Sequence, residues 1–151
     1  MIEIRRAIIE DEGEIFDLFR QFTPGETPPE RINSWQGGTG TFREIVNDDE
    51  KGTVLVAEED NEVVGVITLS YPVAIRCGGI YTCIEEFIVS QKMRGRGVGG
   101  LLLEAAIAEA TAKGCREIQV NRPSELGYPV YLEHGFEDLG KHLNMRLPRQ
   151  A

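Results

Sequence analysis

Residues 91–100 read QKMRGRGVGG, a glycine-rich stretch that lies between a run of β-branched residues and a long run of apolar and small residues. Glycine has no Cβ, so the backbone at these positions can approach a ligand closely. The unpaired N–H groups at the start of a helix attract anions. Lys92, Arg94 and Arg96 add three positive charges to the stretch. It therefore predicts a site for a diphosphate where a strand passes into a helix.

Hydrophobic periodicity predicts the elements on either side of this loop. We expect strands at 2–7, 53–58, 63–70, 80–89, 118–120 and 142–147, helices at 10–22, 98–113 and 129–134, and short helical pieces at 30–36 and 41–48. Residues 59–62 form the turn of a hairpin. The buried face of the long helix is expected to hold Leu101, Leu102, Ala105, Ala108 and Ala112. This order is typical of one α/β domain with a mixed sheet, covering residues 1–151.

Composition excludes several classes of protein. The chain of 151 residues is 41% hydrophobic, which argues against a disordered tail, a collagen-like repeat or a small disulfide scaffold. A formal charge of −9 disfavours broad nucleic-acid binding. The acidic first turns are unlike a secretory signal or a transit peptide, and apolar runs fall short of the ~20 residues of a membrane helix. Three cysteines without a CxxC pair favour reduced thiols in the cytoplasm.

Two other diphosphate motifs deserve comparison with the loop. The spacing Gly95-x-Gly97-x-x-Gly100 matches the dinucleotide fingerprint, and Glu117 lies about 20 residues further on, where a ribose-binding acid is expected. That fingerprint normally opens the first βαβ unit of a sheet, whereas residues 1–90 precede it here. A Walker loop would need a Gly-Lys-Ser/Thr ending that is absent. A dinucleotide oxidoreductase is therefore the less favoured interpretation.

Three blocks carry a more specific resemblance. Arg94-x-x-Gly97-x-Gly99 resembles the Arg/Gln-x-x-Gly-x-Gly/Ala motif of the GNAT N-acetyltransferase superfamily, residues 84–89 (IEEFIV) resemble its central strand, and residues 131–136 (YLEHGF) resemble its Tyr-Glu-x-x-Gly-Phe block. The resemblance implies a single-domain α/β (α+β) fold with a mixed, mostly antiparallel sheet flanked by helices. It also implies a bulge in the central strand that opens a V-shaped slot in the sheet.

The resemblance implies acetyl-CoA as co-substrate and no metal. Its pyrophosphate would lie over the glycine-rich loop, and its pantetheine arm would pair with backbone groups of Phe87 and Val89. The implied cofactor-binding residues are Phe87, Ile88, Val89, Arg94, Gly95, Arg96, Gly97, Val98, Gly99, Ser124 and Tyr131. Ser124 departs from the family pattern, because many members carry an Asn seven residues before the tyrosine. His134 and His142 have no partner at metal-ligand spacing, so we expect both to be structural.

Acetyl transfer to an amine needs a base, since an amine of pKa ~10.4 is protonated at neutral pH, and it benefits from a proton donor to the leaving thiolate. By resemblance Tyr131 is the donor; the alternative is an aromatic that packs under the cofactor. Glu85 and Glu86 resemble the acidic pair of polyamine-type acetyltransferases, although both could be solvated or paired with arginines. Neighbours on a strand face opposite ways, and Glu85 shares parity with Phe87 and Val89, so we expect Glu85 to face the slot unless a bulge rotates it.

The expected function is therefore transfer of an acetyl group from acetyl-CoA to a primary amine of a small molecule, such as a polyamine, an amino acid or an aminoglycoside-like compound. Attack would be direct, within a ternary complex. The alternatives are a peptide or protein N-terminal or lysine acetyltransferase, and a catalytically weak acyl-CoA-binding module. We expect a small amine as partner, no nucleic acid and no membrane, and allow for a homodimer.

Overall fold

The computed structural model describes residues 1–21, 37–140, 142–145, 147 and 148. Its main sheet has five strands in the order β1-β2-β3-β6-β7, antiparallel except for the last pair. The strands are β1 (Glu3–Arg6), β2 (Gly52–Glu59), β3 (Glu62–Ser70), β6 (Thr82–Val89) and β7 (Ile118–Gln119), with a separate two-stranded ribbon of β4 (Val73–Ala74) and β5 (Gly79–Ile80). The helices are α1 (Glu12–Phe19), α3 (Gly38–Asn47), α4 (Val98–Ala112) and α5 (Tyr128–Glu133), and the 3-10 turns are η1 (Ile9–Asp11), η3 (Ile75–Cys77) and η4 (Gln91–Met93).

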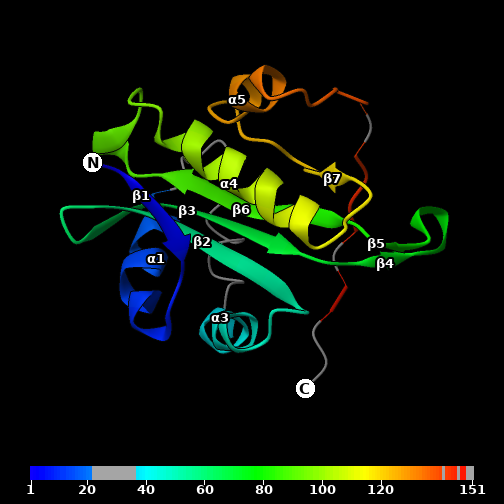
Figure 1. The fold of residues 1–151 in the computed structure, drawn as a ribbon, viewed down its shortest axis with the longest axis horizontal. Helices are drawn as coiled ribbons and strands as arrows, with labels where there is room; N and C mark the ends of the chain where they lie inside the picture. Colours follow the sequence, from blue (N-terminus) through cyan, green and yellow to red (C-terminus); the bar gives the residue numbers. More distant parts are fainter. Residues whose placement is uncertain (22–36, 141, 146, 149–151) are drawn as a thin grey trace.

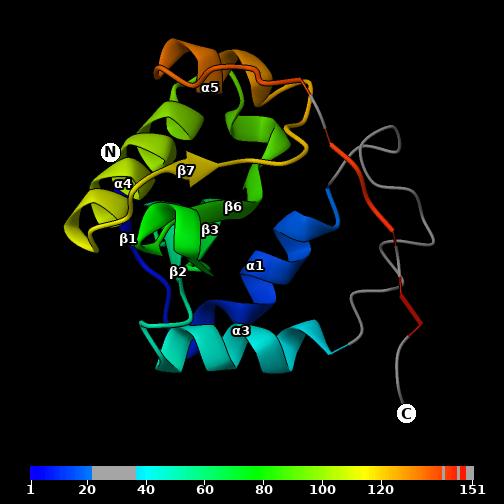
Figure 2. The ribbon, with the colours of Figure 1, turned by 90° about the vertical axis from the view of Figure 1, so that its right-hand side faces the viewer.

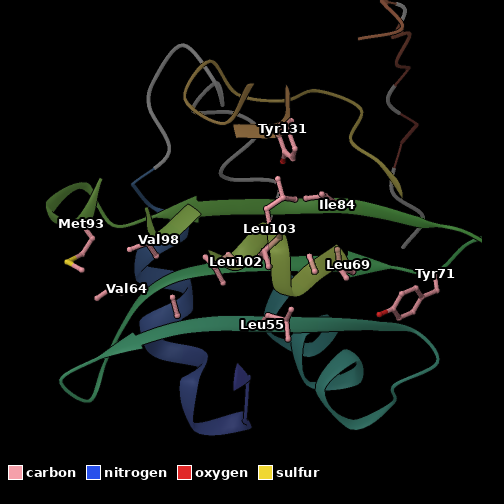
Figure 3. Close-up of a cluster of buried hydrophobic side chains, with 13 residues drawn as sticks. Leu55, Val64, Leu69, Tyr71, Ile84, Met93, Val98, Leu102, Leu103 and Tyr131 are labelled. Atoms are coloured by element: carbon pink, nitrogen blue, oxygen red, sulfur yellow. The ribbon is translucent and has the colours of Figure 1, made fainter. Parts of the chain in front are cut away.

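Helices cover both faces of the main sheet. α4 lies on one face, and α1 and α3 lie on the other (Figures 1 and 2). Alternate residues of β2 enter the two cores, with Leu55 and Ala57 toward α4 and Val54 and Val56 toward α1 and α3. Figure 3 shows the core on the α4 side, where Leu102 and Leu103 lie against the strands. Because both faces are covered, the central strands are apolar along most of their length, as in other buried sheets.

The turn between β2 and β3 confirms the predicted hairpin. Asp60 and Asn61 have positive φ values of 51° and 61°. Two consecutive left-handed residues form the type I′ turn that matches the twist of paired strands. Asn and Asp are the side chains that tolerate this conformation best after glycine.

The buried face of α4 differs from the prediction. Its buried residues are Val98, Leu102, Leu103, Ala106 and Ala110, whereas Leu101, Ala108 and Ala112 are exposed. The contact with β3 explains the orientation: a Cβ built on Gly65 would lie 2.9 Å from Leu102 Cδ1 and 3.3 Å from Val98 Cγ1. The missing side chain of Gly65 thus lets α4 approach the sheet along Val98 and Leu102. The apolar stripe expected from the sequence was wrong because leucine and alanine occur all round this helix.

The C-terminal residues form no strand in the described structure. The expected strand at 142–147 is wrong, since residues 142–145 and 147 lie outside regular structure and Leu143 and Met145 are 97% and 82% exposed. Alternating apolar residues form a strand only where a sheet edge is there to bond them. The helical piece at 30–36 lies outside the described residues. The described helices include none long and apolar enough to cross a membrane.

Candidate active site

The central strand β6 changes phase at Glu85. Residues Ile84 and Glu86 pair with Leu69 and Thr68 of β3, which leaves Glu85 between them as a bulge without a partner in that strand. Side chains on the two sides of the bulge follow different parities: Ile84 and Phe87 both pack in the core on the α4 side. The expected parity of Glu85 with Phe87 was therefore wrong, because one extra residue shifts every later side chain to the other face.

The bulge also redirects the backbone. Ahead of it, Thr82 N–H donates to Glu117 O beside β7, whereas beyond it Ser90 N–H donates to Val64 O of β3. Hydrogen-bonding groups alternate between the two edges of a strand. Phe87 and Val89, three residues and one residue before Ser90, therefore direct their N–H and C=O groups away from β3. These are the backbone groups that the resemblance expects to pair with the pantetheine arm, and that pairing stays a prediction.

A slot opens between β6 and β7 at the same place. The two strands pair in parallel only at Thr82↔Ile118 and Cys83↔Gln119, and β6 continues to Val89. Among the described residues, no strand pairs with the β7-facing edge of β6 beyond Cys83. The V-shaped slot expected from the resemblance is confirmed.

The glycine-rich loop follows β6 and ends in α4, as predicted. Gly95 and Gly97 have φ values of 78° and 82°, a left-handed conformation that side chains rarely adopt. A Cβ built on either would meet nothing within 4 Å, so the space beside the loop is open. Gly97 is the N-cap of α4, whose first N–H groups have no partner within the helix. The sequence thus places backbone donors and a helix N-terminus beside open space.

A cavity of about 310 Å³ lies along this loop. It is lined by Phe87, Ile88, Val89, Met93, Arg94, Gly95, Gly97, Val98, Gly99, Gly100, Ser124, Leu126, Gly127, Val130 and Glu133. Nine of these were expected as cofactor-binding residues, whereas Arg96 and Tyr131, which were also expected, do not line the cavity. Leu126, Gly127, Val130 and Glu133 were missed because the resemblance marks only Ser124 and Tyr131 as cofactor-binding in this stretch. Gly127 lies where a side chain would be crowded: a Cβ there would lie 3.2 Å from Ser124 Oγ and 3.3 Å from Tyr131 Cε2.

Of the three basic residues in the loop, only Arg94 lines the cavity. Its Nε donates to Val89 O at 3.2 Å, and it forms no ion pair among the described residues, so the outer nitrogens of its guanidinium are available to an anion. Lys92 Nζ lies 2.6 Å from Glu62 Oε1, and Arg96 Nη2 lies 3.8 Å from Glu59 Oε1. The hairpin acids thus hold two of the cations that were expected to meet phosphates. Contact of Arg96 with the cofactor stays a prediction.

Ser124 and Tyr131 belong to the segment on the far side of the cavity. Ser124 Oγ accepts the N–H of Gly127 at 3.0 Å, and its C=O accepts the N–H of Tyr128, so Ser124 shapes the turn that begins α5. Tyr131 is 4% exposed and packs edge-on against Phe87. Its hydroxyl makes no hydrogen bond to a described residue, yet no buried side-chain oxygen of these residues lacks a partner, so the hydroxyl keeps contact with solvent. Burial raises the pKa of Tyr131, so the phenol keeps its proton at neutral pH.

The two glutamates occupy different environments. Glu85 is exposed and accepts a hydrogen bond from Ser70 Oγ at 2.6 Å. Glu86 is half-buried, accepts a hydrogen bond from Thr68 Oγ1 and shares the parity of Ile88, which packs in the core beside α1 and α3. Burial raises the pKa of Glu86, the bond from Thr68 lowers it, and the charge of Glu85 raises it further. Neither carboxylate forms an ion pair with a described residue, which is the arrangement a cationic ligand would complete.

The remaining candidate residues do not assemble into a second site. Glu117 lies at the closed end of the slot, where it forms an ion pair with Arg76 and accepts from Gln119. It is therefore no ribose-binding acid for the loop, and the antiparallel sheet is not that of a dinucleotide-binding fold. Cys83 is buried, and burial raises the pKa of its thiol. Within the described residues, no three His, Cys, Asp or Glu side chains gather as metal ligands would.

Comparison with known proteins agrees with this geometry. Residues 13–136 match the acetyltransferase (GNAT) family. The chain belongs to the GNAT acetyltransferase family. It is accordingly an N-acetyltransferase with acetyl-CoA as acetyl donor, and the loop, the freed edge of β6 and the cavity fit such a donor.

Individual relatives are distant. An uncharacterized N-acetyltransferase of Bacillus subtilis strain 168, YhfO, is 27% identical over 141 residues, or 91% of each chain. An acetyltransferase of Clostridium acetobutylicum solved with acetyl-CoA superposes with a TM-score of 0.80 at 22% identity, covering 97% of this chain and 96% of that one. Glucosamine-6-phosphate N-acetyltransferase of Arabidopsis thaliana superposes with a TM-score of 0.74 at 19% identity, covering 99% of each chain. At these identities the two solved structures show the shared fold.

Proposed function

We propose that this GNAT protein acetylates the primary amine of a small molecule by direct attack on acetyl-CoA within a ternary complex. The observation that carries the proposal is the acidic pair on β6. Glu85 and Glu86 lie next to one another beside the slot, and no described cation neutralises either of them. An amine is protonated when it arrives, so an unpaired carboxylate attracts it and offers a place for its proton.

Glu86 is the proposed base. Because burial raises the pKa of its carboxyl group, the carboxylate holds a proton more readily than an exposed glutamate does. It lies on the α1 and α3 side of β6, whereas Phe87 and Val89 pack on the α4 side with the cavity. This arrangement supports an acceptor that reaches the slot from one face and a donor that reaches it from the other. Glu85, exposed at the bulge, is proposed to orient the ammonium group.

The other side of the reaction is assigned to Tyr131 and the loop. When bound, acetyl-CoA supplies the thioester that the amine attacks. The N–H groups of Gly95–Gly99 and the guanidinium of Arg94 are proposed to hold its pyrophosphate. Tyr131 is proposed to give its proton to the departing thiolate, since its hydroxyl is protonated and makes no hydrogen bond to a described residue. Ser124 is proposed to contact the tail of the cofactor.

A panel of amines tests the proposal through release of free CoA thiol. Diamines and polyamines, amino acids, aminosugars and aminoglycosides form one arm; peptides with a free N-terminus or a lysine form the second. Turnover of a small amine, lowered in Glu86→Gln and shifted along the pH axis, supports the proposal. Turnover confined to peptides would assign a peptide or protein acetyltransferase instead. Tight acetyl-CoA binding with no turnover across both arms would leave the acyl-CoA-binding module.

A cytoplasmic location completes the proposal. The three cysteines, Cys77, Cys83 and Cys115, are all free thiols, which is typical of a reducing compartment. Fractionation of the native host would check this.

A further inference from the structure

Thr68 is a buried residue of β3 that lies directly across from Glu86. Its hydroxyl has two contacts with that one residue. Thr68 Oγ1 accepts the backbone N–H of Glu86 at 2.9 Å, and the same oxygen donates its own proton to Glu86 Oε1. A hydroxyl has a single proton to donate. The backbone and the carboxylate of Glu86 are therefore tied to one oxygen atom of the neighbouring strand.

The second oxygen of the carboxylate is left free. Glu86 Oε2 accepts no hydrogen bond from a described residue, and no side-chain oxygen of the described residues is both buried and unbonded. Oε2 therefore keeps contact with solvent while Oε1 is held. The bulge at Glu85 allows Thr68 to hold Glu86, because it turns the N–H of Glu86 toward β3.

We propose that Thr68 is a positioning residue for acetyl transfer: it holds Oε1 of Glu86 and leaves Oε2 to receive the proton of the incoming amine. This inference rests on the proposed role of Glu86 as the base. The donated bond also stabilises the charged carboxylate, which is the form a base needs. The negative charge of Glu85 opposes ionisation of the Glu86 carboxyl group. The hydroxyl of Thr68, on β3, favours ionisation of the same group. Thr68 thus offsets part of the cost of burying the base.

The first experiment reads the carboxyl group without a substrate. The ¹³C resonances of the glutamate side chains are followed against pH in the wild type, and the signal missing from Glu86→Gln identifies Glu86. Thr68→Val removes the hydroxyl and keeps a branched side chain, and Thr68→Ser keeps the hydroxyl. A hydrogen bond to a charged group is worth about 1.5–3 kcal/mol, so we expect the valine variant to titrate about 1–2 pH units higher. The serine variant should titrate near the wild type.

The second experiment uses turnover. In Thr68→Val the acid limb of kcat/KM should move to higher pH with the NMR midpoint, and the serine variant should restore it. In a Glu86→Gln background, Thr68→Val should cause no further change in the pH profile. Thr68→Ala provides the same loss of hydroxyl if the valine variant is misfolded by circular dichroism.

The outcomes separate the two proposals. Unchanged titration of Glu86 in the valine and alanine variants would overturn the role of Thr68, even where Glu86→Gln is inactive. Full activity of Glu86→Gln would overturn the role of Glu86 as base and, with it, the positioning role of Thr68. In Thr68→Val, a raised titration midpoint of Glu86 together with a shifted acid limb of kcat/KM supports both the base role of Glu86 and the positioning role of Thr68.

Discussion

The ring of Tyr131 meets the ring of Phe87 edge-on, with centroids 5.7 Å apart and planes inclined by 62°. Phe87 lies on β6 directly after Glu86, and Tyr131 lies on α5, beyond the slot. This contact links the strand that carries the proposed base to the helix that carries the proposed acid. Phe136 also packs against Tyr131, at 5.2 Å between centroids. Ring packing thus holds the phenol, since its hydroxyl makes no hydrogen bond within the described part of the chain.

Tyr131→Phe separates packing from proton donation. The variant keeps both ring contacts and loses only the hydroxyl, so we expect turnover to fall by about 10- to 1000-fold, near the range of a lost general acid. Acetyl-CoA affinity, measured by calorimetry, should change little. Phe136→Leu is the control, because it loosens the packing of Tyr131 and keeps the hydroxyl. Full turnover in Tyr131→Phe would leave the residue a packing role only.

Gly97→Val tests the loop, and Gly114→Val is its matched control. The two glycines have φ values of 82° and 80°, and a Cβ at either position would meet nothing within 4 Å. Each substitution should therefore destabilise the fold to a similar degree, about 1–2 kcal/mol, from the left-handed backbone alone. Only Gly97 lines the cavity, so we expect Gly97→Val alone to weaken acetyl-CoA binding, by about tenfold or more. Equal affinity in the two variants would place the donor elsewhere.

Arg94→Ala and Lys92→Ala distinguish the cations of the loop. Arg94 lines the cavity without an ion-pair partner among the described residues, whereas Lys92 is bound to Glu62. Loss of one charge-assisted bond should weaken acetyl-CoA binding about 10- to 100-fold in Arg94→Ala, and the dependence of affinity on salt should flatten. We expect Lys92→Ala to bind within about twofold of the wild type. A similar loss in both would show that the Lys92–Glu62 pair opens for the ligand.

Glu86→Gln should make the fold more resistant to heat at alkaline pH. Burial raises the folded-state pKa of Glu86 above its ordinary value, so the native state binds this proton more tightly than the unfolded chain does. The stabilisation that the bound proton gives the native state is present below the ordinary carboxyl pKa. It is lost as the pH rises through the raised pKa of folded Glu86. The melting temperature of the glutamine variant should therefore exceed that of the wild type at pH 8, and the difference should shrink toward pH 4.

Glu137→Gln controls for net charge, because it removes one negative charge at an exposed position far from Glu86 in the sequence. A gain of the same size and pH dependence in this variant would contradict a specific effect of Glu86.

The sequence predicted the loop, the hairpin and the order of the main elements because these depend on local patterns. Gly95 and Gly97 indicate a turn because glycine adopts positive φ readily, and the pair Asp60-Asn61 indicates a hairpin for a similar reason. The bulge at Glu85 depends instead on β3, since the extra residue is defined only against Thr68 and Leu69. Period-two reasoning therefore assigned Glu85 the parity of Phe87.

Other parts of the site depend on contacts between distant segments. The role of Thr68 requires knowing which residue lies across from it, and nothing in the local sequence of β3 marks that threonine. The engagement of Lys92 by Glu62 joins residues 30 positions apart. The buried side of α4 follows from the space beside Gly65 rather than from the leucine and alanine pattern of the helix.

The phase change in β6 also bears on how such a protein diversifies. Beyond the bulge in β6, Ile88 packs on the face covered by α1 and α3, whereas Phe87 and Val89 pack on the face covered by α4. Glu86 shares the parity of Ile88. Substitutions at Glu86 can therefore change the proposed acceptor side while Phe87 and Val89, which line the cavity, stay the same. Under the proposed function, a lineage would be able to change its amine acceptor at one face of this strand and keep its acetyl donor at the other.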